Sequence, residues 1–106
     1  MTEAVLILTT VPNAERGAAI ARLLVEERLA ACVNVCGPMT SFYRWKGTVE
    51  RDDEYQLVIK ATRGRVRAIE TRIKELHSYE LPELLVLSVV DGSQPYLHWL
   101  IQESRA

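Results

Sequence analysis

Residues 29–60, LAACVNVCGPMTSFYRWKGTVERDDEYQLVIK, decide the fold of this chain. Gly37-Pro38 and Gly47 interrupt the stretch, and such residues punctuate strands with turns or bulges. The last part alternates, with Tyr55 and Leu57 on one face of a strand and Gln56 on the other. Three extended runs are therefore predicted, at residues 31–36, 39–46 and 49–61.

The sequence on either side of this stretch predicts one more strand and one helix before it, and a helix, a strand and a final helix after it. Asn13 is suited to cap the first helix, because its side chain can accept from free backbone N–H groups of the first turn. The run at 84–90 is almost continuously apolar, as in a strand buried on both faces. The predicted ranges are 3–10 for the strand, 14–29 for the helix, 66–76 for the second helix, 84–90 for the last strand, and a short helix after Ser93.

The order of these elements is β-α-β-β-α-β with an added C-terminal helix. It predicts an α+β fold of the ferredoxin-like type, in which both helices lie on one face of an antiparallel sheet. The middle hairpin, residues 31–61, is longer than that fold requires and leaves an unprotected edge. A closed ring would cover this edge in every subunit, so we expect a cyclic homo-oligomer.

Length and composition predict one domain, residues 1–106, with 48% hydrophobic and 25% charged residues. A net charge of −1 gives no field that would attract nucleic acid or an anionic membrane. The N-terminus has no basic segment, and its apolar run is too short for a signal peptide. No segment reaches the roughly 20 apolar residues of a membrane span. We therefore expect a cytoplasmic protein.

Cys32 and Cys36 are the only cysteines, and they lie four residues apart in a predicted strand. Four strand steps separate their Cα atoms by about 13 Å, which is too far for a disulfide or for one shared metal ion. Cys32 is flanked by Ala31 and Val33, and free cysteine in such a setting commonly packs as a small hydrophobe. The alternative is a metal site assembled between subunits.

His77 is the histidine with the clearest candidate role, at the end of the second predicted helix. Imidazole is a good ligand for copper, zinc and nickel. The structural alternative is a histidine placed favourably against the negative end of the helix dipole. Glu80 and Glu83 follow on either side of Leu81-Pro82, and this pair is more typical of a structured turn than of acid/base chemistry.

Tyr43 and Trp45 are predicted to share one face of a strand. Aromatic residues with Arg44 between them could stack on a base, but the sequence signature of an RNA-binding strand is absent. An oligomer interface anchored by these two rings is favoured, and nucleic acid is disfavoured. No nucleophile elbow, phosphate-binding loop or zinc-protease helix occurs, so we do not expect an enzyme.

One set of residues along the chain forms a specific pattern when taken together. Its members are Leu29-Ala30-Ala31-Cys32-Val33-Asn34, Ser41, Tyr43, Trp45, Gly47, Glu50, Glu54, Ile59-Lys60, His77, Tyr79, Pro82-Glu83, Gly92, Tyr96-Leu97 and Trp99. With this pattern nearly the whole chain resembles the CutA divalent-cation tolerance family, without gaps from the first strand onward. The resemblance implies a compact homotrimer, similar in architecture to PII signalling proteins, and a link to divalent metal tolerance, copper above all.

The chain departs from the family pattern at the positions of the copper ligands. In bacterial relatives these are a cysteine at the end of the first strand and two adjacent histidines, which match Thr9, Leu76 and His77 here. Only one of the three residues can therefore ligate copper. Ser78 also stands where the family has a turn proline.

Three functions remain open on these grounds. The first is a trimeric metal-binding protein for copper or another divalent ion, with His77 and Cys32 as ligands. The second is a PII-like regulator that binds a small anionic effector in a cleft between subunits, and the third is a non-catalytic interaction scaffold. The expected effector-binding residues are Tyr43, Trp45, Glu54, Lys60 and Arg63.

Overall fold

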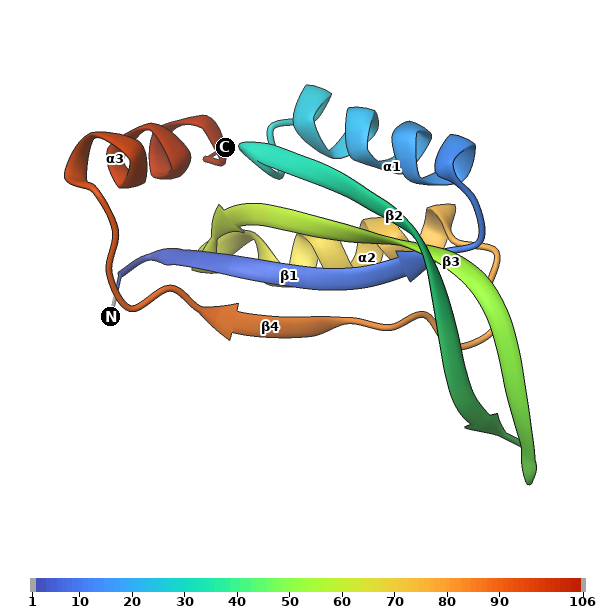
Figure 1. The fold of residues 1–106 in the computed structure, drawn as a ribbon. Coiled ribbons are helices and arrows are strands. Elements are labelled where there is room, and N and C mark those ends of the chain that lie inside the picture. Colours follow the sequence, from blue (N-terminus) through green and yellow to red (C-terminus); the bar gives the residue numbers. More distant parts are fainter. Residues whose placement is uncertain (1, 106) are drawn as a thin grey trace.

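The computed structural model describes residues 2–105, and its element order confirms the predicted α+β fold (Figure 1). The strands and helices alternate as the sequence pattern indicates, with a short 3-10 helix before the second α-helix. The elements are β1 (Ala4–Val11), α1 (Ala14–Glu26), β2 (Cys32–Trp45), β3 (Thr48–Thr62), η1 (Arg63–Arg65), α2 (Val66–Leu76), β4 (Leu85–Ser88) and α3 (Gln94–Glu103).

The strands form one antiparallel sheet in the order β2-β3-β1-β4. Side chains alternate along each strand, so one face carries the large apolar residues that pack under α1 and α2. The third helix, α3, packs instead on Ala4 and Ala31, at one end of the opposite face. The main core consists of Val5, Ile7, Val11, Ile20, Leu24, Ala30, Leu57, Ile59, Ala61, Val66, Ile69 and Ile73.

Two helix starts agree with the sequence pattern, but only one is capped as expected. The side chain of Asn13 accepts a hydrogen bond from the backbone N–H of Arg16 at 2.7 Å. Ser93 precedes α3, yet its side chain makes no capping hydrogen bond. Pro95 in the first turn favours a helix start, and Leu97 and Leu100 pack α3 against the sheet.

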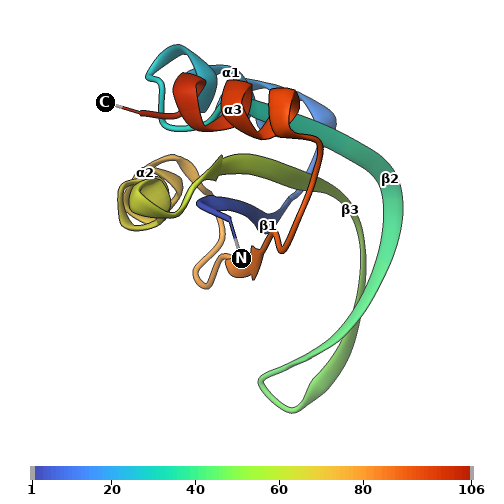
Figure 2. The same cartoon turned by 90° about the vertical axis from the view of Figure 1, so that its left-hand side faces the viewer.

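The hairpin of β2 and β3 is the most extended part of the molecule, and in Figure 2 it curves away from the rest of the chain. The two runs predicted at 31–36 and 39–46 are in fact one strand, because β2 continues past Gly37-Pro38 through a bulge between Cys36 and Met39. The bulge bends the strand and increases its twist. The outer half of the hairpin thus projects beyond the sheet, and the molecule measures 45 × 25 × 22 Å.

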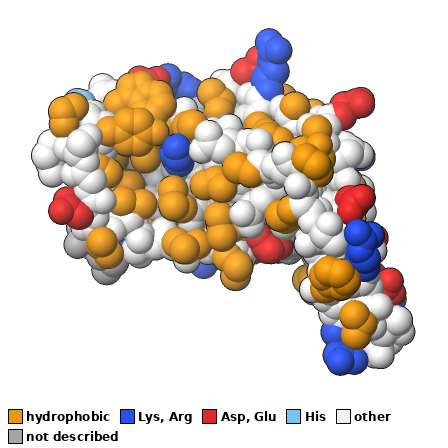
Figure 3. Space-filling view, in the orientation of Figure 1, with side chains coloured by type: hydrophobic (Ala, Val, Ile, Leu, Met, Phe, Trp, Pro, Cys, Tyr) orange, Lys and Arg blue, Asp and Glu red, His pale blue; other side chains and the backbone are white. Residues whose placement is uncertain are grey.

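The prediction that residues 84–90 form a strand buried on both faces is wrong. Strand β4 spans only Leu85–Ser88, lies at the edge of the sheet, and is exposed along its whole length. Of the run, Leu84 packs against the main core and Val89 against the smaller cluster around α3, but the strand between them is exposed. Figure 3 shows hydrophobic side chains spread over the sheet face between α3 and the hairpin. No helix within residues 2–105 combines the length and apolar character that a membrane span requires.

Candidate functional site

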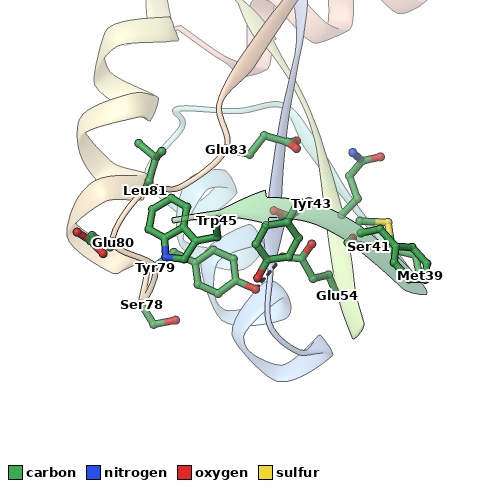
Figure 4. Close-up of a pocket in the computed structure, with 13 residues that line it drawn as sticks. Met39, Ser41, Tyr43, Trp45, Glu54, Ser78, Tyr79, Glu80, Leu81 and Glu83 are labelled. Atoms are coloured by element: carbon green, nitrogen blue, oxygen red, sulfur yellow. Dashed lines mark hydrogen bonds between the residues drawn. The ribbon is translucent and has the colours of Figure 1, made fainter. Parts of the chain in front are cut away.

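A pocket of about 700 Å³ lies where the projecting hairpin meets the loop between α2 and β4 (Figure 4). Residues from three strands and this loop line it, so segments far apart in the sequence form one site. The bend of β2 carries the hairpin over the loop and creates the concave surface. The lining residues are Thr10, Met39, Ser41, Phe42, Tyr43, Trp45, Glu54, Gln56, Ser78, Tyr79, Glu80, Leu81 and Glu83.

The hairpin supplies both aromatic rings and one carboxylate of the pocket. Tyr43 and Trp45 are two residues apart on β2 and project to the same side, as the alternation predicted. Glu54 lies on β3, opposite Met39, and is only 8% exposed. Three of the predicted effector-binding residues therefore lie in one pocket of a single chain.

The loop after α2 is tied to the sheet by side-chain hydrogen bonds. The ring nitrogen Nε2 of His77 lies 2.5 Å from the carbonyl oxygen of Thr10, at the end of β1. The backbone N–H of Tyr79 donates to Nδ1 of His77 at 3.1 Å, and the hydroxyl of Tyr79 donates to Oε2 of Glu54 at 2.7 Å. These contacts place the ring of Tyr79 against the hairpin.

Glu54 and Glu83 give the pocket its negative charge. Burial raises the pKa of Glu83, the nearby charge of Glu54 raises it further, and a hydrogen bond from the Gln56 side chain opposes both effects. The Oε2 atom of Glu83 is buried and has no hydrogen-bond partner. Two carboxylates that repel each other in a partly closed space are a setting that a bound cation would stabilise.

Two tyrosine hydroxyls are also held in their neutral form by neighbouring carboxylates. Tyr43 donates to Asp52, and this hydrogen bond, with burial and nearby negative charge, raises the pKa of Tyr43 to about 12. Burial, followed by the hydrogen bond to Glu54, raises the pKa of Tyr79 well above its usual value. Both phenols therefore stay protonated beyond the pH at which an ordinary tyrosine ionises.

Positive groups are missing from the wall of this pocket. Its described lining contains three glutamates, Glu54, Glu80 and Glu83, and no lysine, arginine or histidine. Lys46 lies at the rim, where its ammonium is 3.9 Å from a carboxylate oxygen of Glu80. The chemistry of the site favours a positively charged ligand over an anion.

His77, predicted as a metal ligand, uses both of its ring nitrogens within the chain. Because the N–H of Tyr79 donates to Nδ1, that nitrogen carries a lone pair and Nε2 carries the proton that it donates to Thr10. A metal ion would have to displace one of these contacts. In this conformation the ring fastens the loop.

Cys32, the second predicted metal ligand, lies far from His77. Cys32 pairs with Lys60 on β3, whereas Thr10, which holds His77, pairs with Gln56. Four residues along β3 correspond to about 13 Å, and β2 and β1 flank β3 on opposite sides. Both cysteines are free. Within residues 2–105 no three His, Cys, Asp or Glu side chains form a group that could hold a metal ion.

Lys60 and Arg63, predicted to bind an anionic effector, lie at the other end of the sheet. The Lys60 ammonium is 5.9 Å from the ring centroid of Tyr96 on α3. Arg63 donates to the hydroxyl of Ser88, at the end of β4, at 3.0 Å. The predicted effector-binding residues therefore form two groups, one aromatic and acidic and the other basic, at different ends of the sheet. That the two groups come together between subunits stays a prediction.

Tyr79 and Glu83 are functional residues of this pocket that were not among the predicted site residues. A structured turn is the favoured interpretation of the pair Glu80 and Glu83, and both Tyr79 and Glu83 belong to the family resemblance, but neither pattern assigns them to a site. The signal available in the sequence was the spacing of Tyr79, Glu80 and Glu83 in a loop that has to return to the sheet. Their approach to Glu54 depends on the bend of β2, which the sequence pattern did not reveal.

The CutA1 divalent ion tolerance protein family matches residues 5–103, which is nearly the entire chain. The chain belongs to this family. The resemblance inferred from the sequence is thereby confirmed, and with it the link to divalent-cation tolerance that the family name carries.

Individual relatives agree with this assignment. The divalent-cation tolerance protein CutA of Thermus thermophilus is 47% identical over 94 residues, which cover 89% of this chain and 91% of the relative. Protein CutA of Mus musculus is 44% identical, but the aligned part covers only 52% of its length, so the chain spans about half of that relative. The crystal structure of CutA from Xylella fastidiosa superposes with a TM-score of 0.95 at 40% identity, covering 98% of this chain and 100% of the other.

The positions that match the family's copper ligands do not form a ligand set here. Thr9 is fully buried in β1, and its hydroxyl has no hydrogen-bond partner. Leu76 is partly buried and packs against the main core. Both ring nitrogens of His77 are engaged, so the acidic pocket, whose described lining has no basic residue, is the candidate place for a cation in a single chain.

Proposed function

We propose that this protein contributes to divalent-cation tolerance by reversible binding and not by catalysis, and that the cation binds in the pocket between the hairpin and the loop after α2. The observation that carries the proposal is the pair of carboxylates, Glu54 and Glu83, in a pocket without a basic residue in its described lining. The family name supports a divalent ion as the ligand.

The donor atoms of the pocket fit a divalent metal in part. Carboxylate oxygens bind hard divalent ions, and at a given oxygen or nitrogen site Cu(II) has the highest affinity of the first-row ions. The buried Oε2 atom of Glu83 has no hydrogen-bond partner, so a cation bound there would break no existing hydrogen bond. Glu54 keeps one carboxylate oxygen besides the one that accepts from Tyr79. Water or a second copy of the chain would complete the coordination, and copper is our first candidate.

The functional form that we propose is a homotrimer in the cytoplasm. Strands β2 and β4 are the free edges of the sheet, and an exposed edge offers unpaired backbone groups with which another chain can pair. Leu85 and Leu87 pair with Leu8 and Leu6, so all four lie on the sheet face opposite the main core. The exposed fractions of Leu85 and Leu87, 56% and 44%, support burial of this face between subunits.

Isothermal titration calorimetry of the intact protein tests the proposed site. Cu(II), Zn(II) and Mn(II) are titrated separately into the wild type and into Glu54→Gln and Glu83→Gln, which keep the shape of each side chain. We expect at least one ion to bind, and either substitution to weaken binding about tenfold or more. Glu15→Gln, an exposed carboxylate in the first turn of α1, is the matched control and should bind as the wild type does.

The same titration tests whether the metal binds instead to His77 and Cys32, the ligands predicted from the sequence. If His77→Gln or Cys32→Ser abolishes uptake while the glutamate substitutions do not, the metal binds outside this pocket and the proposal is overturned. Absence of uptake for all three ions in the wild type would also overturn it.

A further inference from the structure

The pocket has an aromatic wall that a bare metal ion does not need. Tyr43 and Trp45 come from β2, and Tyr79 comes from the loop after α2. Figure 4 shows the three rings gathered in the pocket, with Glu83 on one side of them and Glu54 on the other. The hydrogen bond from the Tyr79 hydroxyl to Glu54 holds the ring of the loop beside the rings of the hairpin.

The size of the pocket exceeds that of an ion. Its volume of about 700 Å³ lies within the range of about 300–1,000 Å³ that is typical of sites for small organic molecules. An organic ligand in such a pocket would bury apolar surface against the rings while its charge lies near the carboxylates.

The electrostatics of the wall select a cation. The face of an aromatic ring carries negative quadrupole potential, which attracts ammonium groups. The hydroxyls of Tyr43 and Tyr79 donate to Asp52 and Glu54, so neither is free to donate to an anion in the pocket.

The chain itself already places one ammonium group at the rim. The Nζ atom of Lys46 lies 5.7 Å from the centroid of the Trp45 ring and 3.9 Å from a carboxylate oxygen of Glu80. The ammonium of Lys46 thus contacts an aromatic face and a carboxylate at the same time. Other residues provide the same two kinds of contact inside the pocket. Its side chain is 73% exposed, so another cation can displace the ammonium from these two contacts.

We infer that the pocket binds a small organic ammonium ion, held by its charge against Glu54 and Glu83 and by its alkyl groups against Tyr43, Trp45 and Tyr79. The inference rests on the proposed function to the extent that both assign a cation to this pocket, but it names a ligand class that a metal site does not require. Lys46 is then a competitor at the rim.

Fluorescence titration of Trp45 tests this inference. Trp99→Phe removes the other tryptophan, which lies on α3 away from the pocket, and provides the background for all variants. Tetramethylammonium chloride is titrated against sodium chloride at equal ionic strength, and tert-butanol serves as a neutral probe of similar size. We expect a saturable change with tetramethylammonium and none with tert-butanol at the same concentrations.

The inference predicts that substitutions at different residues change the affinity for tetramethylammonium in opposite directions. Glu54→Gln and Glu83→Gln should weaken tetramethylammonium binding, whereas Lys46→Gln should strengthen it by about two- to fivefold, because the internal ammonium no longer competes. Glu15→Gln should leave binding unchanged. Equal responses to tetramethylammonium and tert-butanol, or no saturable response to either, would overturn the inference.

The two proposals fail separately. Uptake of a divalent ion without tetramethylammonium binding overturns the organic-cation inference and leaves the metal proposal intact. Binding of tetramethylammonium without uptake of any tested metal overturns the metal proposal and leaves the organic-cation inference intact.

Discussion

Glu83 shows how one residue links the stability of the chain to the chemistry of its pocket. Its pKa is raised above the ordinary 4.5, first by burial and then by the charge of Glu54. The folded state therefore binds a proton at Glu83 more tightly than the unfolded chain does. Stability from this group is present below pH 4.5 and is lost as the pH rises through the raised pKa.

Glu83→Gln should accordingly be more stable than the wild type at pH 7, because the glutamine carries no charge to bury. The advantage should shrink as the pH falls below the ordinary carboxyl pKa, where the wild type is protonated in both states. Urea denaturation at a series of pH values measures this difference. Glu80→Gln, an exposed neighbour in the same loop, is the control, and an equal effect at both positions would contradict the assignment of the shift to Glu83.

Thr9 carries a buried hydroxyl that makes no hydrogen bond. Replacing it by valine keeps the branched shape and removes the unsatisfied polar group, so Thr9→Val should raise the free energy of unfolding by about 1 kcal/mol. Thr62→Val is the matched comparison, because the hydroxyl of Thr62 donates to the carbonyl oxygen of Ser104 at 3.0 Å. That change should lower stability, and the same sign for both variants would refute this account.

The sequence predicted which side chains share a face of the sheet better than it predicted their individual contacts. Tyr43, Trp45 and Glu54 lie in one pocket, as expected for effector-binding residues, because alternation along a strand fixes the side to which each residue points. The engagement of both nitrogens of His77 was not predictable, because it depends on the carbonyl of Thr10, 67 residues away in the chain.

Strand β2 is the element that shapes the site. Gly37 lies in its bulge with φ of 151°, and a Cβ there would come within 2.8 Å of the ring of Tyr55. Both the backbone conformation and the close contact require glycine.

Gly37→Ala should therefore lower the free energy of unfolding by about 1–3 kcal/mol and weaken ligand binding in the pocket, because the hairpin can no longer bend in the same way. Gly64→Ala is the control, since a Cβ at Gly64 meets nothing within 4 Å. Thermal denaturation of the two variants makes the comparison. Similar melting temperatures would show that the bend tolerates a side chain.

Element types were predictable from periodicity, but strand ends and partners were not. The helices follow their apolar stripes, and Asn13 caps α1 as its side chain predicts. The run at 84–90 was misjudged because an apolar strand looks the same whether the chain's own helices or another surface cover it. The two runs of β2 were separated at Gly37-Pro38 because a bulge and a turn share the same residues.

The whole molecule leaves a broad apolar sheet face and two strand edges uncovered. If three copies cover these surfaces, Leu87→Lys should prevent assembly, because it places a charge on the sheet face opposite the core. Multi-angle light scattering should then report a smaller mass than for the wild type. Val25→Lys is the matched control, because Val25 is also an exposed hydrophobic residue but lies on α1 and not on this sheet face. This variant should keep the wild-type mass. A monomeric wild type would contradict the homotrimer outright.

The overall fold was predictable from the sequence, because the order of elements leaves few ways to build one antiparallel sheet. The pocket was not predictable, because it lies between a bent hairpin and a loop that has no periodic sequence pattern. Opposite charge distributions at the two ends of the sheet also emerged only from the fold, which separates Lys60 and Arg63 from Glu54.

Native mass spectrometry of the intact protein, with and without Cu(II), tests most directly the claim that the pocket binds a cation. We predict a trimer that takes up one ion per chain, with uptake kept in Glu15→Gln and lost when Glu54 and Glu83 are both changed to glutamine. Uptake that survives the double substitution, or a wild type that takes up no ion, would contradict the claim.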